Sequence, residues 1–376
     1  MRALIRWVVG TVFIVHGFIH LVGAIKGFGW ADVSQLTEPI GTMMGACWLA
    51  AGAMSVVAGV LLIARASTWW ILAAVAALSS QALILSAWND AKAGTVANVL
   101  LAIAAAYGLR SQGPRSFRSR FRQVARETSA SVKPTVVGPV TDRELGHLPS
   151  PVANYLRRAG TLGRPHIFGF HADISGRIRG GSDQPWMSWR GEQVNTYGAT
   201  PSRVFYMDAT MKGLPTDVLH AYVGPSARMQ VRLASLATIV DAHGPEMDQA
   251  ETVTLLNDLC ILAPAALVDA PIEWSSLDSH HVRATYRNAG HTVSAVLTFD
   301  EQDQLVDFVS DDRLRSSSDG RTFTRQRWST PLADYRSFGD RRLASRGRAF
   351  WQPTDGPSFD YLEFHVDNIT YQEAKP

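Results

Sequence analysis

The first 109 residues of the chain hold almost no charge, and this feature limits the possible folds more than any other. A helix needs about 20 mainly apolar residues to cross the hydrocarbon core of a bilayer. Four stretches here are long and apolar enough: 7–25, 40–63, 68–88 and 93–109. Tryptophans lie near their ends, where the amphipathic indole ring favours the membrane interface. The sequence therefore predicts a bundle of four transmembrane helices over residues 1–109.

The basic residues that flank these stretches predict the orientation, because lysine and arginine in short loops favour the cytoplasmic side. One side of the predicted bundle would hold nine arginines: Arg2, Arg6, Arg65, Arg110, Arg115, Arg118, Arg120, Arg122 and Arg126. The other side would hold only Lys26 and Lys92. We therefore expect a multi-pass protein of the cell (inner) membrane, with its N-terminus and its C-terminal domain in the cytoplasm.

Polar residues inside the predicted spans are candidate functional groups, because they are costly to bury in a bilayer. His16 and His20 lie four residues apart and therefore share one helical face. Two imidazoles at this spacing could bind a metal or haem, or relay protons. The alternative is a hydrogen-bonded seam with Gln81 and Asn98 in the third and fourth spans. Because no acidic residue lies within the spans, we favour the seam and predict no metal and no cofactor.

Residues 110–145 are interpreted as a basic juxtamembrane helix and a linker. Phe117, Phe121 and Val124 recur at i, i+4 and i+7 with arginines between them, which is the pattern of a short helix on the membrane surface. Arginines beside a span also attract anionic lipids. Alternatively, these charges only fix the orientation of the fourth helix. No fold for reading bases accompanies the basic residues, so we expect membrane lipids rather than nucleic acid as partners.

Residues 146–376 have the composition of a soluble, β-rich domain. Short alternating runs predict strands at 167–174, 203–207, 281–286, 292–299, 305–309, 322–328, 348–352 and 361–371. The segment Met247 to Val268 reads as a helix interrupted at Pro264, and it is apolar on almost every side, so it must be buried. We therefore predict an α+β domain in which a curved, mostly antiparallel sheet, an open half-barrel, carries this helix on its concave face.

Two carboxylates on this helix are weak catalytic candidates. Glu251 and Asp258 are seven residues apart and lie on one face, as an acid/base pair would. More often such a pair solvates or caps a helix. The sequence has neither a phosphate-binding glycine loop nor a nucleophile elbow, and Cys47 and Cys260 are too few for a zinc site. Enzymatic activity is therefore not the favoured interpretation.

A second group of candidates could bind a ligand. Arg313, Arg325 and Arg327 could bind an anionic head group. The alternative for Arg325 and Arg327, which share one strand face, is a solvated face paired with Asp311 and Asp312. Tryptophans could line an apolar pocket or fill the core: Trp186, Trp189, Trp274 and Trp328.

Several motifs together resemble a bacterial, membrane-anchored domain family of unknown function. They are Leu148-Pro149-x-Pro151-Val152-x-x-Tyr155-Leu156, the pair Trp186 and Trp189, Glu251-x-x-x-Leu255-Leu256-Asn257-Asp258, and Ile369-Thr370-Tyr371. The resemblance covers about residues 146–372 and implies a domain that follows a four-helix membrane region. The chain departs from the family at Asp258 and Cys260, where a glutamate and an aromatic residue are usual, which leaves the role of that carboxylate open.

Two further resemblances concern the overall architecture. The stretch from His16 to Gly23 is similar to the first helix of small four-span proteins of the DoxX type. The strand order looks like that of bacterial lipoprotein carriers, which hold acyl chains between a curved sheet and a helix. A cytoplasmic orientation would argue against lipoprotein export itself.

Three functional hypotheses follow. In the first, the cytoplasm-facing domain binds a lipid or other apolar molecule. In the second, the protein is a membrane enzyme of lipid or quinone chemistry that uses His16 and His20, or Glu251 and Asp258. In the third, it is a structural or regulatory membrane protein that binds another protein. A dry pocket between sheet and helix would favour the first. The sequence carries no signal of the oligomeric state.

Overall fold

The computed structural model describes residues 3–133 and 136–374. The chain divides into two compact units. The first consists of Met1–Ser119 with Ala234–Leu236, and the second of Arg120–Leu233 with Ala237–Pro376.

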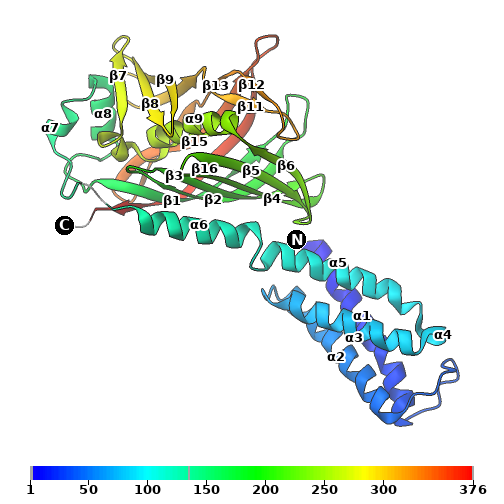
Figure 1. Ribbon diagram of the computed structural model, residues 1–376. Coiled ribbons are helices and arrows are strands. Elements are labelled where there is room, and N and C mark those ends of the chain that lie inside the picture. Colours follow the sequence, from blue (N-terminus) through cyan, green and yellow to red (C-terminus); the bar gives the residue numbers. More distant parts are fainter. Residues whose placement is uncertain (1–2, 134–135, 375–376) are drawn as a thin grey trace. The chain divides into compact units, whose positions relative to one another are not determined.

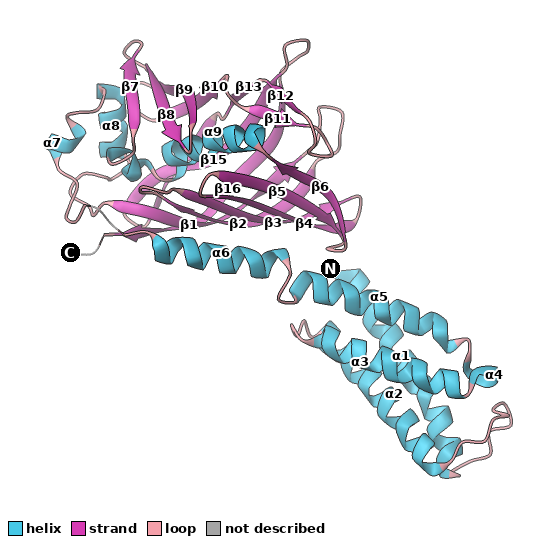
Figure 2. Ribbon diagram, in the orientation of Figure 1, coloured by secondary structure: helices cyan, strands magenta, loops and turns pink. Residues whose placement is uncertain are grey.

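The first unit is helical, as Figure 2 shows. Its helices are α1 (Ala3–Phe28), α2 (Thr42–Ile63), α3 (Trp69–Ser86), the single turn α4 (Trp88–Ala91) and α5 (Gly94–Gln112). Four helices are long and apolar enough to cross a membrane. Each begins and ends within a few residues of the predicted span, except that the first helix already starts at Ala3.

Helices α1 and α2 approach so closely that their backbones touch. A Cβ atom added to Gly17 would lie 2.6 Å from the carbonyl oxygen of Gly52, and one added to Gly52 would lie 2.7 Å from that of Gly17. Pairs of glycines repeat this contact at both ends, with Gly10 beside Gly59 and Gly27 beside Gly45. Small residues at such positions allow the van der Waals packing that holds helices together in lipid.

The second unit is built on a 14-stranded, antiparallel sheet. Its strands are β1 (Ile167–Ile178), β2 (Met187–Thr196), β3 (Ser202–Met211), β4 (Leu214–Val223), β5 (Ser226–Leu233), β6 (Ala237–His243), β7 (Ile272–Ser276), β8 (His281–Asn288), β9 (His291–Phe299), β10 (Leu305–Ser310), β13 (Arg327–Ser329), β14 (Leu332–Phe338), β15 (Arg341–Gln352) and β16 (Phe359–Glu373). The order is β6-β5-β4-β3-β2-β1-β16-β15-β13-β10-β9-β8-β7, with β14 paired to β15. Two short strands, β11 (Leu314–Ser316) and β12 (Phe323–Arg325), form a separate pair.

The sheet curves around helix α9 (Pro245–Leu262), which continues into a 3₁₀ turn at Pro264–Val268 (Figure 1). The helix packs against β5 and β6 on one side and against β8, β9 and β10 on the other. The predicted buried helix, its interruption and its place on the concave face of a curved sheet are thereby confirmed.

Two tyrosines donate hydrogen bonds to carbonyl groups at the C-terminal end of α9. Helix α8 (Ser150–Arg158), which follows the single turn α7 (Asp142–Leu145), supplies Tyr155, whose hydroxyl donates to the Cys260 carbonyl at 2.9 Å. The hydroxyl of Tyr371, on β16, donates to the Leu262 carbonyl at 2.7 Å. The last carbonyl groups of a helix have no partner within the helix, so these bonds remove the cost of burying them.

The amphipathic helix expected on the membrane surface is α6 (Phe117–Ser131), and its apolar side is covered by the protein. In the second unit it runs along the outer face of the sheet (Figure 1). Phe121 contacts the ring of Tyr206 on β3 at 6.2 Å between centroids, and Ser129 accepts a hydrogen bond from Gln372 on β16. The prediction of an apolar face turned toward lipid is therefore wrong, because the sheet offers that face a dry surface.

Candidate functional site

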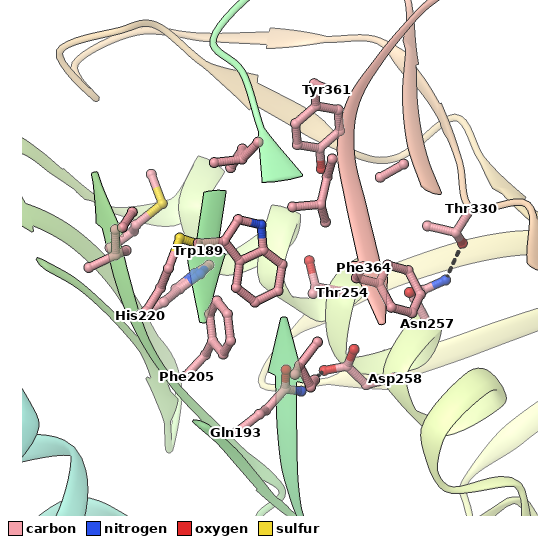
Figure 3. Close-up of a pocket in the computed structure, with 18 of the residues that line it drawn as sticks. Trp189, Gln193, Phe205, His220, Thr254, Asn257, Asp258, Thr330, Tyr361 and Phe364 are labelled. Carbon is pink, nitrogen blue, oxygen red and sulfur yellow. Dashed lines mark hydrogen bonds between the residues drawn. The ribbon is translucent and has the colours of Figure 1, made fainter. Parts of the chain in front are cut away.

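A cavity of about 350 Å³ lies between the inner face of β1–β5 and helix α9. Strands β13, β15 and β16 contribute to its remaining wall. Figure 3 shows side chains from the sheet and from α9 converging on this space. Its volume and its mainly apolar wall are those of a small-molecule site, and a few polar groups lie within it.

The apolar wall follows from the alternation of side chains along the strands. On β3, Phe205, Met207, Ala209 and Met211 face the cavity. Four of the five methionines of the second unit line it: Met187, Met207, Met211 and Met229. Methionine side chains are flexible and polarizable, so this wall can adapt to ligands of varied shape.

Gly191 sets the position of one aromatic ring in this wall. A Cβ atom at Gly191 would lie 2.7 Å from the ring of Phe205 on the neighbouring strand. Without that atom, the Phe205 ring can lie over β2, where it meets Trp189 edge to face at 5.8 Å between centroids. The two rings together form one continuous apolar surface.

Asp258 anchors the polar part of the cavity. Its Oδ2 atom accepts hydrogen bonds from Gln193 Nε2 at 2.7 Å, Asn195 Nδ2 at 3.0 Å and Arg203 Nε at 2.8 Å. These donors come from β2 and β3, so the contacts tie α9 to one half of the sheet.

Glu251 lies two turns before Asp258 on the same face of α9, and it is surrounded by cationic and polar groups. Its Oε2 atom lies 3.3 Å from Arg203 Nη1 and 3.0 Å from His220 Nε2. Its Oε1 atom lies 3.4 Å from Arg313 Nη2 and accepts a hydrogen bond from Thr254 at 3.1 Å. The network therefore joins β3, β4 and the segment after β10 through one carboxylate of α9.

The protonation states follow from this geometry. Burial alone would raise the pKa of Glu251, yet His220, Arg203 and Arg313 hold it below its usual range. Burial alone would lower the pKa of Arg203, yet Asp258 and Glu251 raise it. Burial lowers the pKa of His220, and its carboxylate neighbour offsets this only in part. These shifts favour the charged forms of Glu251 and Arg203 and the neutral form of His220, whose Nδ1 accepts from Arg203 Nη1 at 3.3 Å.

The expectation that Glu251 and Asp258 solvate or cap the helix is wrong. Their exposed fractions are 0% and 5%, and both are paired with arginines. Sequence reasoning missed the partners Gln193, Asn195 and Arg203, although one signal was available. Arg203 is in phase with Phe205 and Met207, so on a strand it must share their buried face.

The candidate ligand-binding residues separate into two groups. Trp189, Trp328 and Arg313 lie in the wall of the cavity. Trp186 lies outside the wall, with the Arg179 guanidinium 4.5 Å from its ring, and Trp274 is half-buried on β7. Arg325 and Arg327 pair with Asp312 and Asp311 at the surface, which agrees with the alternative of a solvated, paired face.

The polar residues of the helical unit form the predicted seam. His20 Nδ1 donates to the His16 carbonyl at 3.0 Å, so its Nε2 accepts from Ser80 Oγ at 2.9 Å. His16 Nε2 donates to Asn98 Oδ1 at 3.0 Å, and Asn98 Nδ2 donates to Gln81 Oε1 at 3.0 Å. These bonds join α1, α3 and α5.

No grouping of three or more histidine, cysteine or acidic side chains that could hold a metal occurs within the described ranges 3–133 and 136–374.

Solved structures with similar folds are distant. A domain described as an outer membrane lipoprotein-sorting protein from Vibrio parahaemolyticus is 11% identical, with a TM-score of 0.31, covering 55% of this chain and 86% of that one. A DUF1329 family protein from Desulfovibrio piger is 11% identical, with a TM-score of 0.33, covering 59% and 92%. A β-barrel-like DUF1849 protein from Brucella abortus is 7% identical, with a TM-score of 0.24, covering 56% and 100%. Likenesses at this level say nothing about function.

No curated protein gives a significant match to the sequence. The model of one family, described as a family of unknown function (DUF6544), matches residues 138–364. This match does not reach the four apolar helices, so the similarity of His16–Gly23 to DoxX-type proteins stays a prediction. The predicted family of unknown function is confirmed, and because the match covers more than half of the chain, the protein belongs to the DUF6544 family.

Proposed function

We propose that the protein is a membrane-anchored binding protein whose sheet unit holds a lipid or another apolar molecule. The observation that carries this proposal is the cavity of about 350 Å³ between β1–β5 and α9. A well-packed protein interior leaves few voids larger than a water molecule. A large void lined by methionine, tryptophan and phenylalanine therefore favours a ligand over a purely structural role.

The helical unit supplies the anchor. Its four apolar helices fit a bilayer by length and composition, and the arginine asymmetry favours an orientation in which the sheet unit faces the cytoplasm. In this arrangement, the domain would draw its ligand from the inner leaflet of the cell membrane. The division into a membrane region, a basic junction and a binding domain belongs to the same proposal.

Binding is favoured over catalysis by the surroundings of Glu251, one of the two candidate carboxylates. A catalytic acid or base needs a free position toward the substrate and a pKa near the working pH. Glu251 is in contact with two arginines and a histidine, and these neighbours lower its pKa further from neutrality. Glu251 therefore acts as a counter-charge within the fold.

The test compares variants of the full-length protein purified in mild detergent. Ala209→Leu adds volume inside the cavity, whereas Thr210→Leu introduces the same side chain on the opposite face of β3. Extracted lipids are quantified by mass spectrometry, with native mass spectrometry to count bound molecules. We expect Ala209→Leu to lose a molecule that the wild-type protein and Thr210→Leu both retain. Lipids on the helices are common to all three proteins and cancel in the comparison. Equal lipid content in Ala209→Leu and the wild type would contradict the proposal.

A further inference from the structure

The wall of the cavity contains hydrogen-bond donors that lack an acceptor. The indole Nε1 of Trp189 and the Nε of Arg313 are both buried, and neither has a hydrogen-bond partner among the described residues. Trp189 is only 4% exposed, and Figure 3 shows its nitrogen on the edge of the ring that faces away from Phe205. A buried donor without a partner costs free energy, so an acceptor supplied by the ligand would recover it.

Two other pairs of polar side chains in the wall satisfy each other. Trp328 Nε1 donates to the Tyr361 hydroxyl at 3.1 Å, and Asn257 Nδ2 donates to Thr330 Oγ1 at 2.6 Å. Trp189 therefore differs from Trp328, although both indoles lie in the same wall.

The charges of the cavity are balanced without a ligand. Arg203 pairs with Asp258 and Glu251, and Arg313 pairs with Glu251. Arg179, which also lines the cavity, pairs with Asp360. His220 Nδ1 accepts from Arg203 Nη1 at 3.3 Å, as a neutral imidazole does, and burial lowers the pKa of His220. Three arginines thus face three carboxylates. A charged head group would add an uncompensated charge to a buried site, and this is far more costly than adding a neutral acceptor.

We infer that the ligand is an uncharged lipid with an ester or other carbonyl oxygen, which accepts the hydrogen bond of the Trp189 indole. This inference rests on the proposed function and specifies its ligand class. It also sets the size of the ligand. Along β2, cavity residues extend from Met187 to Gln193, roughly 20 Å at the rise of a strand. With a volume of about 350 Å³, this cavity has room for one chain-like ligand.

The experiment offers three deuterated probes of equal carbon number to the detergent-solubilised, full-length protein at neutral pH: a fatty acid methyl ester, the free fatty acid and the alkane. Native mass spectrometry gives the occupancy of each. We expect the methyl ester to bind about tenfold more tightly than the alkane, because one buried donor gains its partner. The free acid should bind more weakly than the ester.

Two matched variants test whether the preference for the ester depends on the Trp189 indole. Trp189→Phe should abolish the preference for ester over alkane while alkane binding persists. Trp274→Phe makes the same change outside the cavity and should leave the preference intact. A stronger affinity for the free acid, equal binding of ester and alkane, or a preference that survives in Trp189→Phe would each overturn the inference alone. Failure of all three probes to bind would overturn the proposed function as well.

Discussion

At the scale of single residues, the charges on α9 explain why a polar cluster can lie inside an apolar domain. Glu251 and Asp258 would be costly to bury alone, but arginines from the sheet meet both of them. Removing one partner from such a pair leaves a buried charge unpaired, which is more destabilising than the loss of one contact.

Glu251→Gln should therefore destabilise the second unit strongly. The substitution leaves Arg203 and Arg313 short of one counter-charge, with an expected loss of about 3–5 kcal/mol in the free energy of unfolding. Chemical denaturation of the full-length protein in detergent measures this. Asp142→Asn is the control, because the Arg157–Asp142 pair is exposed and should contribute less than about 1 kcal/mol. A similar, small effect of both substitutions would show that the buried network contributes little.

Asp307 makes a pH-dependent contribution to stability. Unlike the charge of Glu251, the charge of Asp307 is unfavourable in the folded state. Burial raises its pKa to about 6, although backbone amides of Phe308 and Thr330 oppose the shift. The folded state thus holds this proton more tightly than the unfolded state, whose pKa is about 3.9. Stability from this group is present below pH 4 and is lost as the pH rises through 6.

Asp307→Asn should consequently raise the melting temperature at pH 8 and leave it nearly unchanged at pH 4. Because the side chain is only partly buried, we expect a gain of about 1–2 kcal/mol at pH 8. Thermal unfolding at the two pH values measures the difference, and the exposed Asp355→Asn serves as the reference. An equal effect at both pH values would mean that lost hydrogen bonds, rather than ionisation, determine the result.

At the scale of elements, residues of the family motifs act on helix ends. Tyr155 and Tyr371 donate to carbonyl groups in the last turn of α9. These two tyrosines therefore fix the buried helix against α8 and β16.

The glycine contacts between α1 and α2 yield a prediction at the same scale. Gly52→Leu would force the two backbones apart, because a Cβ atom there already lies 2.7 Å from the Gly17 carbonyl oxygen. We expect a loss of about 1–3 kcal/mol, or more if the helices separate. Thermal unfolding in detergent measures it. Ala53→Leu, at the exposed neighbouring position, should have little effect, and comparable losses in both variants would argue against the close contact.

At the scale of the whole molecule, the orientation of the two units toward the membrane is the main expectation. A reporter joined to the C-terminus should be active if it functions in the cytoplasm, as green fluorescent protein does, and inactive if it requires the periplasm. A reporter inserted after Asp32, between α1 and α2, should behave in the opposite way. Periplasmic activity at the C-terminus would reverse the proposed orientation and the proposed source of the ligand.

Local pattern alone determined several features of this protein. The length of the apolar runs determined the four helices, since about 20 consecutive apolar residues are typical of a helix long enough to cross a bilayer. The apolar surface of the segment from Met247 to Val268 determined that α9 is buried. Alternation located β1, β3, β8, β9 and β10, where one face of each strand is apolar.

Only the tertiary structure decided the surroundings of the site. Strands β5, β6, β7, β11 and β14 were not predicted. Strands β2 and β4 were missed because inward positions such as Gln193, Asn195 and His220 are polar and interrupt the alternation. Those side chains are tolerated inside because α9, distant in sequence, brings carboxylates to them. From the sequence alone, a carboxylate on a helix is expected to be solvated, because its partners are not visible there. Folding brings those partners together from separate strands.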